Sequence, residues 1–296
     1  MHDGTGPNDE HRMRMRGKIL RRSASFNVAH AVDDIEPGTG AQSIQRALSL
    51  LNLVGLIAGE RRGGAGLSEI ASISGRPKAS VHRMLQALIA MGYVERLDEG
   101  GYRLGVQSQI LGQLAQKSVD PLVTESESGL LRLAELSRDT AFLTLRTGNF
   151  SICARREEGF GDILNNALSV GDRHPLGIGA GSLAILSELT PAEVDAQFEA
   201  NAQLLTERYP KVSVPQLLDI IDQARSDGFV HNPGLFAQGS WAVGVPLRIR
   251  GTRPRAALSI ASIPDRVTGS RVERLVALLR REAKAIAEAL AEHPNP

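Results

Sequence analysis

The sequence predicts an α+β protein, with an N-terminal winged helix-turn-helix domain followed by a larger domain of mixed strands and helices. Three observations predict it. Residues 67–91 contain two short amphipathic helices separated by a Gly-Arg-Pro turn. Two β-favouring segments joined by paired glycines follow directly, at residues 93–104. Beyond residue 119, strand-like segments alternate with helical ones, which is typical of a sheet covered by helices.

Length and composition limit the possible classes of protein. The 296 residues leave room for two domains, each able to bury its own core. A single cysteine, Cys153, excludes a disulfide framework and a cysteine-rich zinc site. No apolar run approaches a membrane span, and residues 1–40 lack the apolar stretch of a signal peptide. We therefore expect a cytoplasmic protein with no metal, no cofactor and no membrane partner.

Basic residues are concentrated in the first part of the chain. Residues 1–40 have no apolar period, and we expect a disordered tail there. Residues 41–105 hold eight basic against five acidic residues, whereas the rest from residue 106 holds 20 against 22. This distribution favours contact between the first domain and a polyanion. The tail adds nonspecific phosphate contacts, or it is simply solvated, or it results from a start codon assigned upstream of the true one. Its basic residues are Arg12, Arg14, Arg16, Lys18, Arg21 and Arg22.

The predicted DNA-binding domain spans residues 41–105. Its first helix begins at the capping residue Ser43 and carries apolar residues at helical spacing to Ile57. The next helix covers residues 67–73, and the turn Gly75-Arg76-Pro77 ends it because proline disrupts a helix interior. The longer helix that follows ends at Gly92, and its inward-facing residues at i, i+3, i+4 and i+7 are Val81, Met84, Leu85 and Leu88.

Position along that longer helix assigns candidate DNA contacts. Lys78 and Ser80 lie near its N-terminus, where backbone N–H groups also point outward, so we expect them to meet phosphate. His82 and Arg83 lie about one turn further along, where side chains reach base edges. Arginine is the preferred bidentate partner of guanine.

A hairpin is predicted directly after this helix. Tyr93 to Leu97 and Tyr102 to Leu104 are β-favouring, and the glycines between them allow positive φ. In a winged helix-turn-helix the longer helix enters the major groove and the hairpin lies against the DNA backbone. Arg103 and Arg96 would carry the hairpin's phosphate contacts. The alternative, a helical subdomain with a solvated polar face, is less consistent with the hairpin.

The second domain is predicted over residues 119–292. Its candidate strands are residues 141–146, 151–155, 164–170, 242–249 and 255–263. Its candidate helices are a long one from Val119, one leading to Leu189, one begun by Thr190-Pro191, one from Val214 to Asp227, and a final one reaching Leu290.

The segment KASVHRMLQALIAMGYVER followed by GGYRLG resembles the DNA-binding domain of IclR-type transcriptional regulators, and the similarity continues to about Leu290. The resemblance implies a GAF-like α/β effector-binding domain at residues 119–292 and a linker helix at residues 106–118. It also implies that the DNA-binding domains pair as a dimer. A packed linker would have the same apolar pattern as a pairing helix, whose residues would be Ile110, Leu111 and Leu114.

The glycine-rich run GDRHPLGIGAGSLAIL has three readings. A phosphate loop is disfavoured because the spacing fits no known pattern and no lysine follows. A nucleophile at Ser182, with His174 and His231, is disfavoured because Ala180 interrupts the GxSxG elbow. By resemblance, the run borders the effector pocket and donates N–H groups to a carboxylate or carbonyl. The residues concerned are Gly179, Ala180 and Gly181.

The resemblance aligns the opposite wall of that pocket with four residues, to which we add Ile163 and Trp241. The four are Asn232, Ala242, Ser259 and Ala261. Family members often have an acid at the first position and cysteine or serine at the others. In this chain the neutral Asn232 stands in place of the acid, and Ala242 and Ala261 stand in place of cysteine or serine. These differences imply a more apolar pocket, so we expect an aromatic or otherwise partly apolar acid or amide as effector. The alternative is a filled core in a domain that only dimerises.

The sequence therefore predicts a DNA-binding transcriptional regulator, of the repressor type, that binds double-stranded operator DNA as a homodimer or a tetramer. A small organic effector would change that binding. Two alternatives come from other classes: an effector-independent DNA-binding or dimerisation protein, and a hydrolase with a DNA-binding domain. Protection of an operator would separate the regulator and the effector-independent protein from the hydrolase. A ligand-dependent change in protection separates the regulator from the effector-independent protein.

Overall fold

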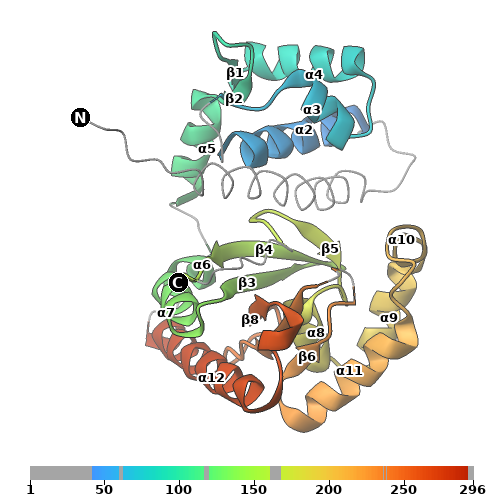
Figure 1. The fold of residues 1–296 in the computed structure, drawn as a ribbon, viewed down its shortest axis with the longest axis vertical. Helices are drawn as coiled ribbons and strands as arrows, with labels where there is room; N and C mark the ends of the chain where they lie inside the picture. The colour runs from blue at the N-terminus through green and yellow to red at the C-terminus, as the bar shows by residue number, and fades with distance from the viewer. Residues whose placement is uncertain are drawn as a thin grey trace. The chain divides into compact units, whose positions relative to one another are not determined.

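The structure is a computed structural model that describes residues 42–59, 63–116, 120–160, 168–235, 237 and 239–292. The tail at residues 1–40, with its basic cluster, and the candidate Ile163 lie outside the described residues. The chain divides into two compact units, residues 1–118 and residues 119–296 (Figure 1). No helix within the described ranges is long and apolar enough to cross a membrane.

The first unit contains the predicted helices and hairpin. Its elements are α2 (Gln42–Gly59), α3 (Leu67–Ile73), α4 (Lys78–Ala90), β1 (Val94–Arg96), β2 (Tyr102–Leu104) and α5 (Val106–Gln116). Pro77 stands directly before α4, in the extended conformation that lets the helix begin. Gly92 ends α4 as predicted: at φ +75°, its N–H donates to Ile89 O at 2.9 Å.

One core holds these elements together. Leu53 of α2, Ile70 of α3, Leu85 of α4 and Tyr102 of β2 are almost completely buried in it. β1 and β2 pair antiparallel with Val94 opposite Leu104. The Tyr102 N–H also donates to Ala65 O at 2.9 Å, which ties the hairpin to the loop before α3. The predicted helix-turn-helix with a following hairpin is confirmed.

The second unit is a six-stranded antiparallel sheet, in the order β5-β4-β3-β8-β7-β6, with helices on both faces. Its strands are β3 (Thr140–Thr147), β4 (Phe150–Glu157), β5 (Arg173–Pro175), β6 (Val230–Asn232), β7 (Trp241–Pro246) and β8 (Ala256–Ser262). Its helices are α6 (Pro121–Glu125), α7 (Glu127–Ser137), α8 (Ala180–Ser187), α9 (Pro191–Ala200), α10 (Ala202–Arg208), α11 (Val214–Asp227), the short η1 (Pro264–Arg266) and α12 (Gly269–Glu292).

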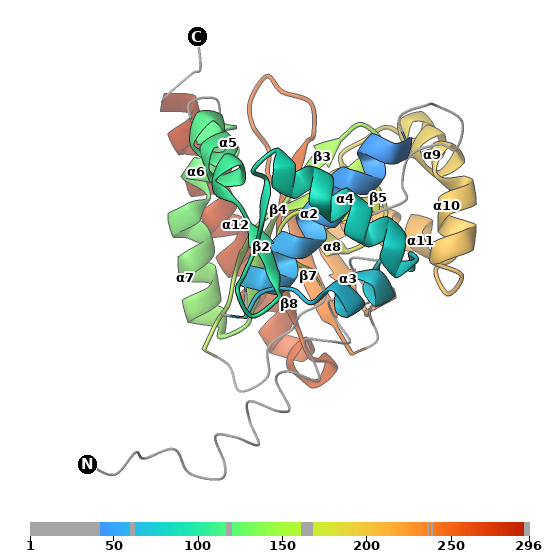
Figure 2. The same ribbon diagram turned by 90° about the horizontal axis from the view of Figure 1, so that it is seen from above.

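The two faces of this sheet have separate cores. Helices α6, α7 and α12 cover one face, here called the α12 face, where Leu143, Val243 and Ile260 are buried (Figure 2). Helices α8 and α11 lie on the other side, the α8 face, where Leu183 and Ile221 pack around the sheet residue Ala257. Strand residues therefore alternate between two differently covered faces. The predicted α+β architecture is confirmed.

Local turns produce the differences from the predicted elements. The helix predicted from Val119 is two helices, α6 and α7, separated at Ser126. The strand predicted at residues 164–170 is wrong for residues 168–170, which form no strand. A turn with Gly171 at φ +88° precedes the strand that forms instead, β5. Thr190 caps α9 as predicted, in a reciprocal capping box with Glu193.

Candidate nucleic-acid interface and ligand site

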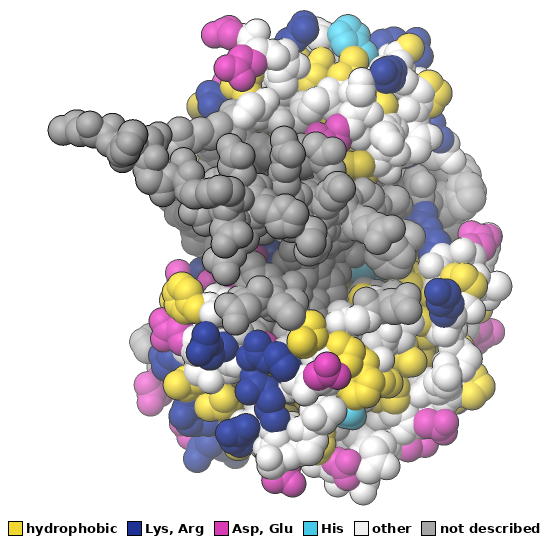
Figure 3. All heavy atoms as spheres, viewed as in Figure 1, with side chains coloured by type: hydrophobic (Ala, Val, Ile, Leu, Met, Phe, Trp, Pro, Cys, Tyr) yellow, Lys and Arg dark blue, Asp and Glu magenta, His cyan; other side chains and the backbone are white. Residues whose placement is uncertain are grey.

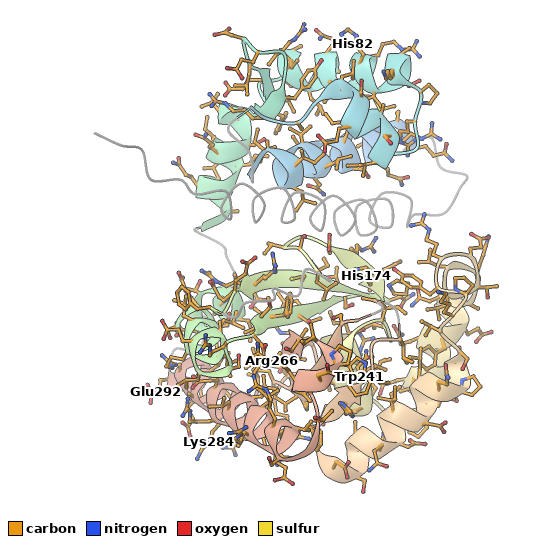
Figure 4. The ribbon with its side chains drawn as sticks, in the orientation of Figure 1. His82, His174, Trp241, Arg266, Lys284 and Glu292 are labelled. Carbon is orange, nitrogen blue, oxygen red and sulfur yellow. The ribbon has the colours of Figure 1, made fainter. Side chains whose placement is uncertain are left out.

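Helix α4 buries one face and exposes another that carries most of the predicted DNA contacts. Val81, Leu85 and Leu88 point into the core of the unit, whereas Lys78, His82 and Arg83 are exposed. His82 projects away from the body of its unit (Figure 4). In the space-filling view from the same side, Lys and Arg side chains lie on both sides of this histidine (Figure 3). The exposed face of α4 is therefore polar and basic.

The start of α4 offers additional hydrogen-bond donors. The N-cap residue Pro77 makes no side-chain cap hydrogen bond. Ser80 is half-buried, and its backbone N–H donates to Pro77 O at 2.9 Å. The N–H groups of Lys78 and Ala79 have no acceptor among the described residues. An anion at this helix start would meet both N–H groups and the Lys78 ammonium.

The basic side chains of the interface differ in their partners. Within the described part of the chain, Lys78, Arg83 and Arg96 form no ion pair and are exposed. Arg103 instead forms a salt bridge with Glu95 across the hairpin. His82 lies beside Gln86, with 3.5 Å between their Nε2 atoms. Five of the six predicted contact residues are thus exposed on α4 or the hairpin, and Ser80 is the half-buried one.

Most of the described candidate effector residues lie on the α8 face of the larger sheet. The strand register places Asn232 beside Ala242, Ala242 beside Ala261, and Ala261 beside Thr140. Partners across antiparallel strands point to the same side, so these four side chains share one face. Ser259, two residues along β8, lies on that face as well and is 4% exposed.

The start of α8 lies over the neighbouring part of this face. A methyl group on Gly244 would come within 2.8 Å of Ala180 O, and one on Gly181 within 2.3 Å of Thr144 Oγ1. Only glycine allows these close approaches. Gly179 has φ +90° and begins the helix without a side-chain cap. The structure therefore brings the Gly179–Gly181 segment onto the same face as Ala242, Ser259 and Ala261.

Trp241 lies on the other face of the sheet. It packs against the core under α12 and meets His231 edge-on, with ring centroids 5.5 Å apart. Its neighbour Ala242 points to the α8 face. The structure therefore does not bring Trp241 together with the other candidate effector residues.

Asn232 already has local partners. Its Oδ1 accepts hydrogen bonds from the N–H groups of Gly234 and Leu235, at 3.0 and 3.3 Å. These bonds fix the turn after β6. If Asn232 contacts a ligand, its amide nitrogen would therefore make the contact.

Two buried polar residues on or beside the α8 face were missed by sequence reasoning. Thr140 is 1% exposed and its Oγ1 has no hydrogen-bond partner among the described residues. Burial raises the pKa of Asp172 to about 7, against the opposing effects of the Ser169 N–H and the Arg156 charge. Thr140 could have been found from the alternation of β3. No local signal distinguishes Asp172 from an ordinary turn residue.

The structure gives no support to a catalytic triad in the glycine-rich run. Ser182 Oγ accepts the Gly177 N–H at 2.8 Å, and His174 Nδ1 lies 2.7 Å from the Tyr209 hydroxyl. His231 is on the α12 face with Trp241, away from Ser182 on α8. Among the described residues, no group of His, Cys, Asp and Glu could hold a metal ion.

Comparisons with known proteins give the family. Residues 43–98 match the IclR helix-turn-helix domain, and residues 116–288 match the bacterial transcriptional regulator IclR C-terminal domain. The transcriptional regulator KipR of Bacillus subtilis is 28% identical over 83% of this chain and 95% of its own length. The acetate operon repressor of Salmonella typhimurium is 26% identical, covering 84% of this chain and 90% of the repressor.

Solved structures agree on the fold. An IclR homologue from Microbacterium hydrocarbonoxydans, crystallised with 4-hydroxybenzoate, superposes with a TM-score of 0.61 at 21% identity. That comparison covers 83% of this chain and 98% of the homologue. The two domain matches together span most of the sequence, and the exposed helix α4 lies within the first of them. The chain belongs to the IclR family of DNA-binding bacterial transcriptional regulators.

Proposed function

We propose that this protein is a repressor that binds operator DNA through α4 and the hairpin, and that a small organic effector in the larger unit changes that binding. The observation that carries the proposal is the exposed basic face of α4, whose Lys78 and Arg83 have no ion-pair partner among the described residues. Unpaired cations are available to phosphates and base edges. The repressor role is supported by the similarity to the acetate operon repressor.

The effector is proposed to bind on the α8 face, between the start of α8 and the small side chains of β7 and β8. Backbone N–H groups at the start of α8 suit a carboxylate, and Ala242 and Ala261 suit an apolar body. The Microbacterium hydrocarbonoxydans homologue was crystallised with 4-hydroxybenzoate, an acid of this kind. Aromatic carboxylates are therefore the first ligands to test.

The protein is proposed to act as a homodimer, or as a tetramer built from two dimers. The large apolar side chains that helix α5 exposes include Ile110, Leu111 and Leu114, and Leu114 is 57% exposed. Contiguous apolar side chains on a surface helix favour association. A symmetric dimer would present two copies of α4 to an operator with two-fold symmetry.

Nuclease protection of the DNA upstream of the protein's own gene tests this proposal. The full chain is expected to protect a defined site at a stated salt concentration, and the aromatic acid that binds is expected to change that protection. Protection without any ligand response would favour an effector-independent DNA-binding protein. Absence of protection on this and on a panel of genomic fragments would contradict the proposal.

A further inference from the structure

The buried polar atoms of the larger unit that lack a hydrogen-bond partner within the described residues include two on or beside the α8 face. They are Oγ1 of Thr140 and Oδ1 of Asp172, in residues that are each 1% exposed. An unsatisfied buried polar group costs about 1–3 kcal/mol, so each such atom calls for an explanation. One such explanation is a bound molecule that supplies the missing hydrogen bond.

Backbone hydrogen bonds fix the position of Asp172. The Cys153 N–H donates to Asp172 O at 2.9 Å, and the Gly171 N–H donates to Cys153 O at 2.8 Å. Asp172 therefore lies beside Cys153 of β4. Its Oδ2 accepts the Ser169 N–H at 2.7 Å, which holds the carboxyl group in one orientation. Of the two carboxyl oxygens, only Oδ1 is left without a partner within the described part of the chain, and it cannot easily rotate towards another donor.

Cys153 connects Asp172 to the candidate effector site. The thiol packs with Phe142 and Ala261 in a small cluster that is separate from the core under α8. Ala242 lies at the margin of the same cluster. Burial and then the Asp172 charge raise the pKa of the Cys153 thiol, so carboxyl and thiol are close enough to interact. Asp172 thus lies beside the Cys153 end of this cluster, and Ala261 and Ala242 form its other end.

A second charged group lies at the same edge. Arg156 is opposite Phe142 in the strand register, which puts its side chain on the α8 face. Its charge lowers the pKa of Asp172, and it forms an ion pair with Glu158 at 2.7 Å. The patch therefore has an apolar floor and a polar edge at which Asp172 offers a hydrogen-bond acceptor. A wholly apolar ligand would leave that acceptor unsatisfied.

We propose that the effector carries a hydroxyl or amino group that donates a hydrogen bond to Asp172 Oδ1, and that this contact selects such molecules over analogues without the donor. The inference rests on the proposed function and specifies the effector's chemistry. Above its pKa of about 7 the Asp172 carboxyl is ionised, and a hydrogen bond to it then contributes about 1.5–3 kcal/mol, which corresponds to a preference of roughly 10- to 150-fold. Thr140 Oγ1 is a second group that the ligand can satisfy.

Calorimetric titration of the full chain with matched carboxylic acids at about pH 8, where most of the Asp172 carboxyl groups are ionised, tests this. The pairs are 4-hydroxybenzoate against benzoate, and 4-hydroxyphenylacetate against phenylacetate. Wild type is expected to bind at least one hydroxylated acid about tenfold or more tightly than its partner. In Asp172→Asn the amide oxygen is held by the Ser169 N–H, so the free position becomes an NH₂ donor, and the preference is expected to fall to about twofold or less. Asp195→Asn, at an exposed position on α9, makes the same change away from the site and should leave the preference intact.

The results that would overturn this inference differ from those that would overturn the proposed function. Equal affinity within each pair, no binding of either hydroxylated acid, or an unchanged preference in Asp172→Asn would overturn the hydrogen-bond assignment. Failure of the proposed function would instead appear as loss of sequence-specific DNA protection by wild type. The ratio of affinities within a pair also distinguishes loss of the hydrogen bond from structural damage, because general destabilisation weakens the binding of both acids alike.

Discussion

Arg103 and Glu95 lie opposite each other on the hairpin strands β2 and β1 and form a salt bridge on its surface. Their side chains are 56% and 44% exposed, so water competes for both groups. Exposed pairs of this kind contribute about 0–1 kcal/mol. A DNA phosphate can therefore take Arg103 away from Glu95 at little cost, and Glu95 limits how strongly the hairpin attracts DNA.

Glu95→Gln is expected to strengthen DNA binding. It removes the carboxylate that holds Arg103 and lowers the repulsion between hairpin and phosphate. An affinity gain of about two- to fivefold at low salt corresponds to the energy of one exposed ion pair. Filter binding or fluorescence anisotropy on the operator fragment would measure it. Glu99→Gln, also exposed and in the turn between the strands, is the control for the loss of one negative charge. Equal gains in the two variants would show that release of Arg103 plays no part.

Leu114→Glu is expected to weaken self-association. The side chain is 57% exposed on α5, so the substitution should leave the fold of one subunit intact while it places a charge in the proposed interface. Sedimentation across a concentration series would show a higher dissociation constant. Gln113→Glu adds the same charge to the same helix. If Leu114→Glu self-associates as strongly as Gln113→Glu, α5 is not part of the interface.

Ala242→Leu and Trp241→Phe are expected to separate the two faces of the sheet. The leucine side chain would occupy the α8-face patch beside Ala261 and weaken binding of an aromatic acid by about tenfold or more, the cost of overfilling a packed site. Trp241→Phe changes the core under α12 and should lower the melting temperature with little change in ligand affinity. The reverse pattern, found by calorimetry and thermal melting, would place the ligand on the α12 face.

Asp172 is expected to make folding stability depend on pH. Burial raises the pKa of its carboxyl from 3.8 to about 7 in the folded chain, so the folded state holds this proton more tightly than the unfolded state. The associated stability is fully present below about pH 4 and is lost as pH rises through about 7. Asp172→Asn should remove this contribution. Urea unfolding of both proteins from pH 5 to pH 8 would show a smaller fall in the variant, and parallel curves would contradict the assignment.

The helix-turn-helix could be predicted from the sequence because each of its signals is local. The apolar spacing of Val81, Leu85 and Leu88 fixes the buried face of α4, and Pro77 and Gly92 mark its ends. A side chain on a surface helix is either on the buried face or off it, so the exposed positions of Lys78 and Arg83 follow from the same spacing.

The ligand site could be predicted only in part, because it depends on contacts between distant segments. Ala242, Ser259 and Ala261 share a face through strand pairing that no local pattern specifies. Trp241 was placed with them although adjacent strand residues point to opposite faces. Thr140 and Asp172 were missed because their burial comes from strands and turns far away in the sequence.

The most direct test of the DNA-binding account is the operator affinity of Arg83→Ala measured against a scrambled fragment of equal length. This variant is expected to lose about 1–3 kcal/mol of discrimination between operator and scrambled DNA, because it removes a base contact. Arg250→Ala, at an exposed position in the larger unit, removes the same charge and should retain full discrimination. If Arg83→Ala discriminates between the two fragments as well as Arg250→Ala does, Arg83 of α4 does not read the operator.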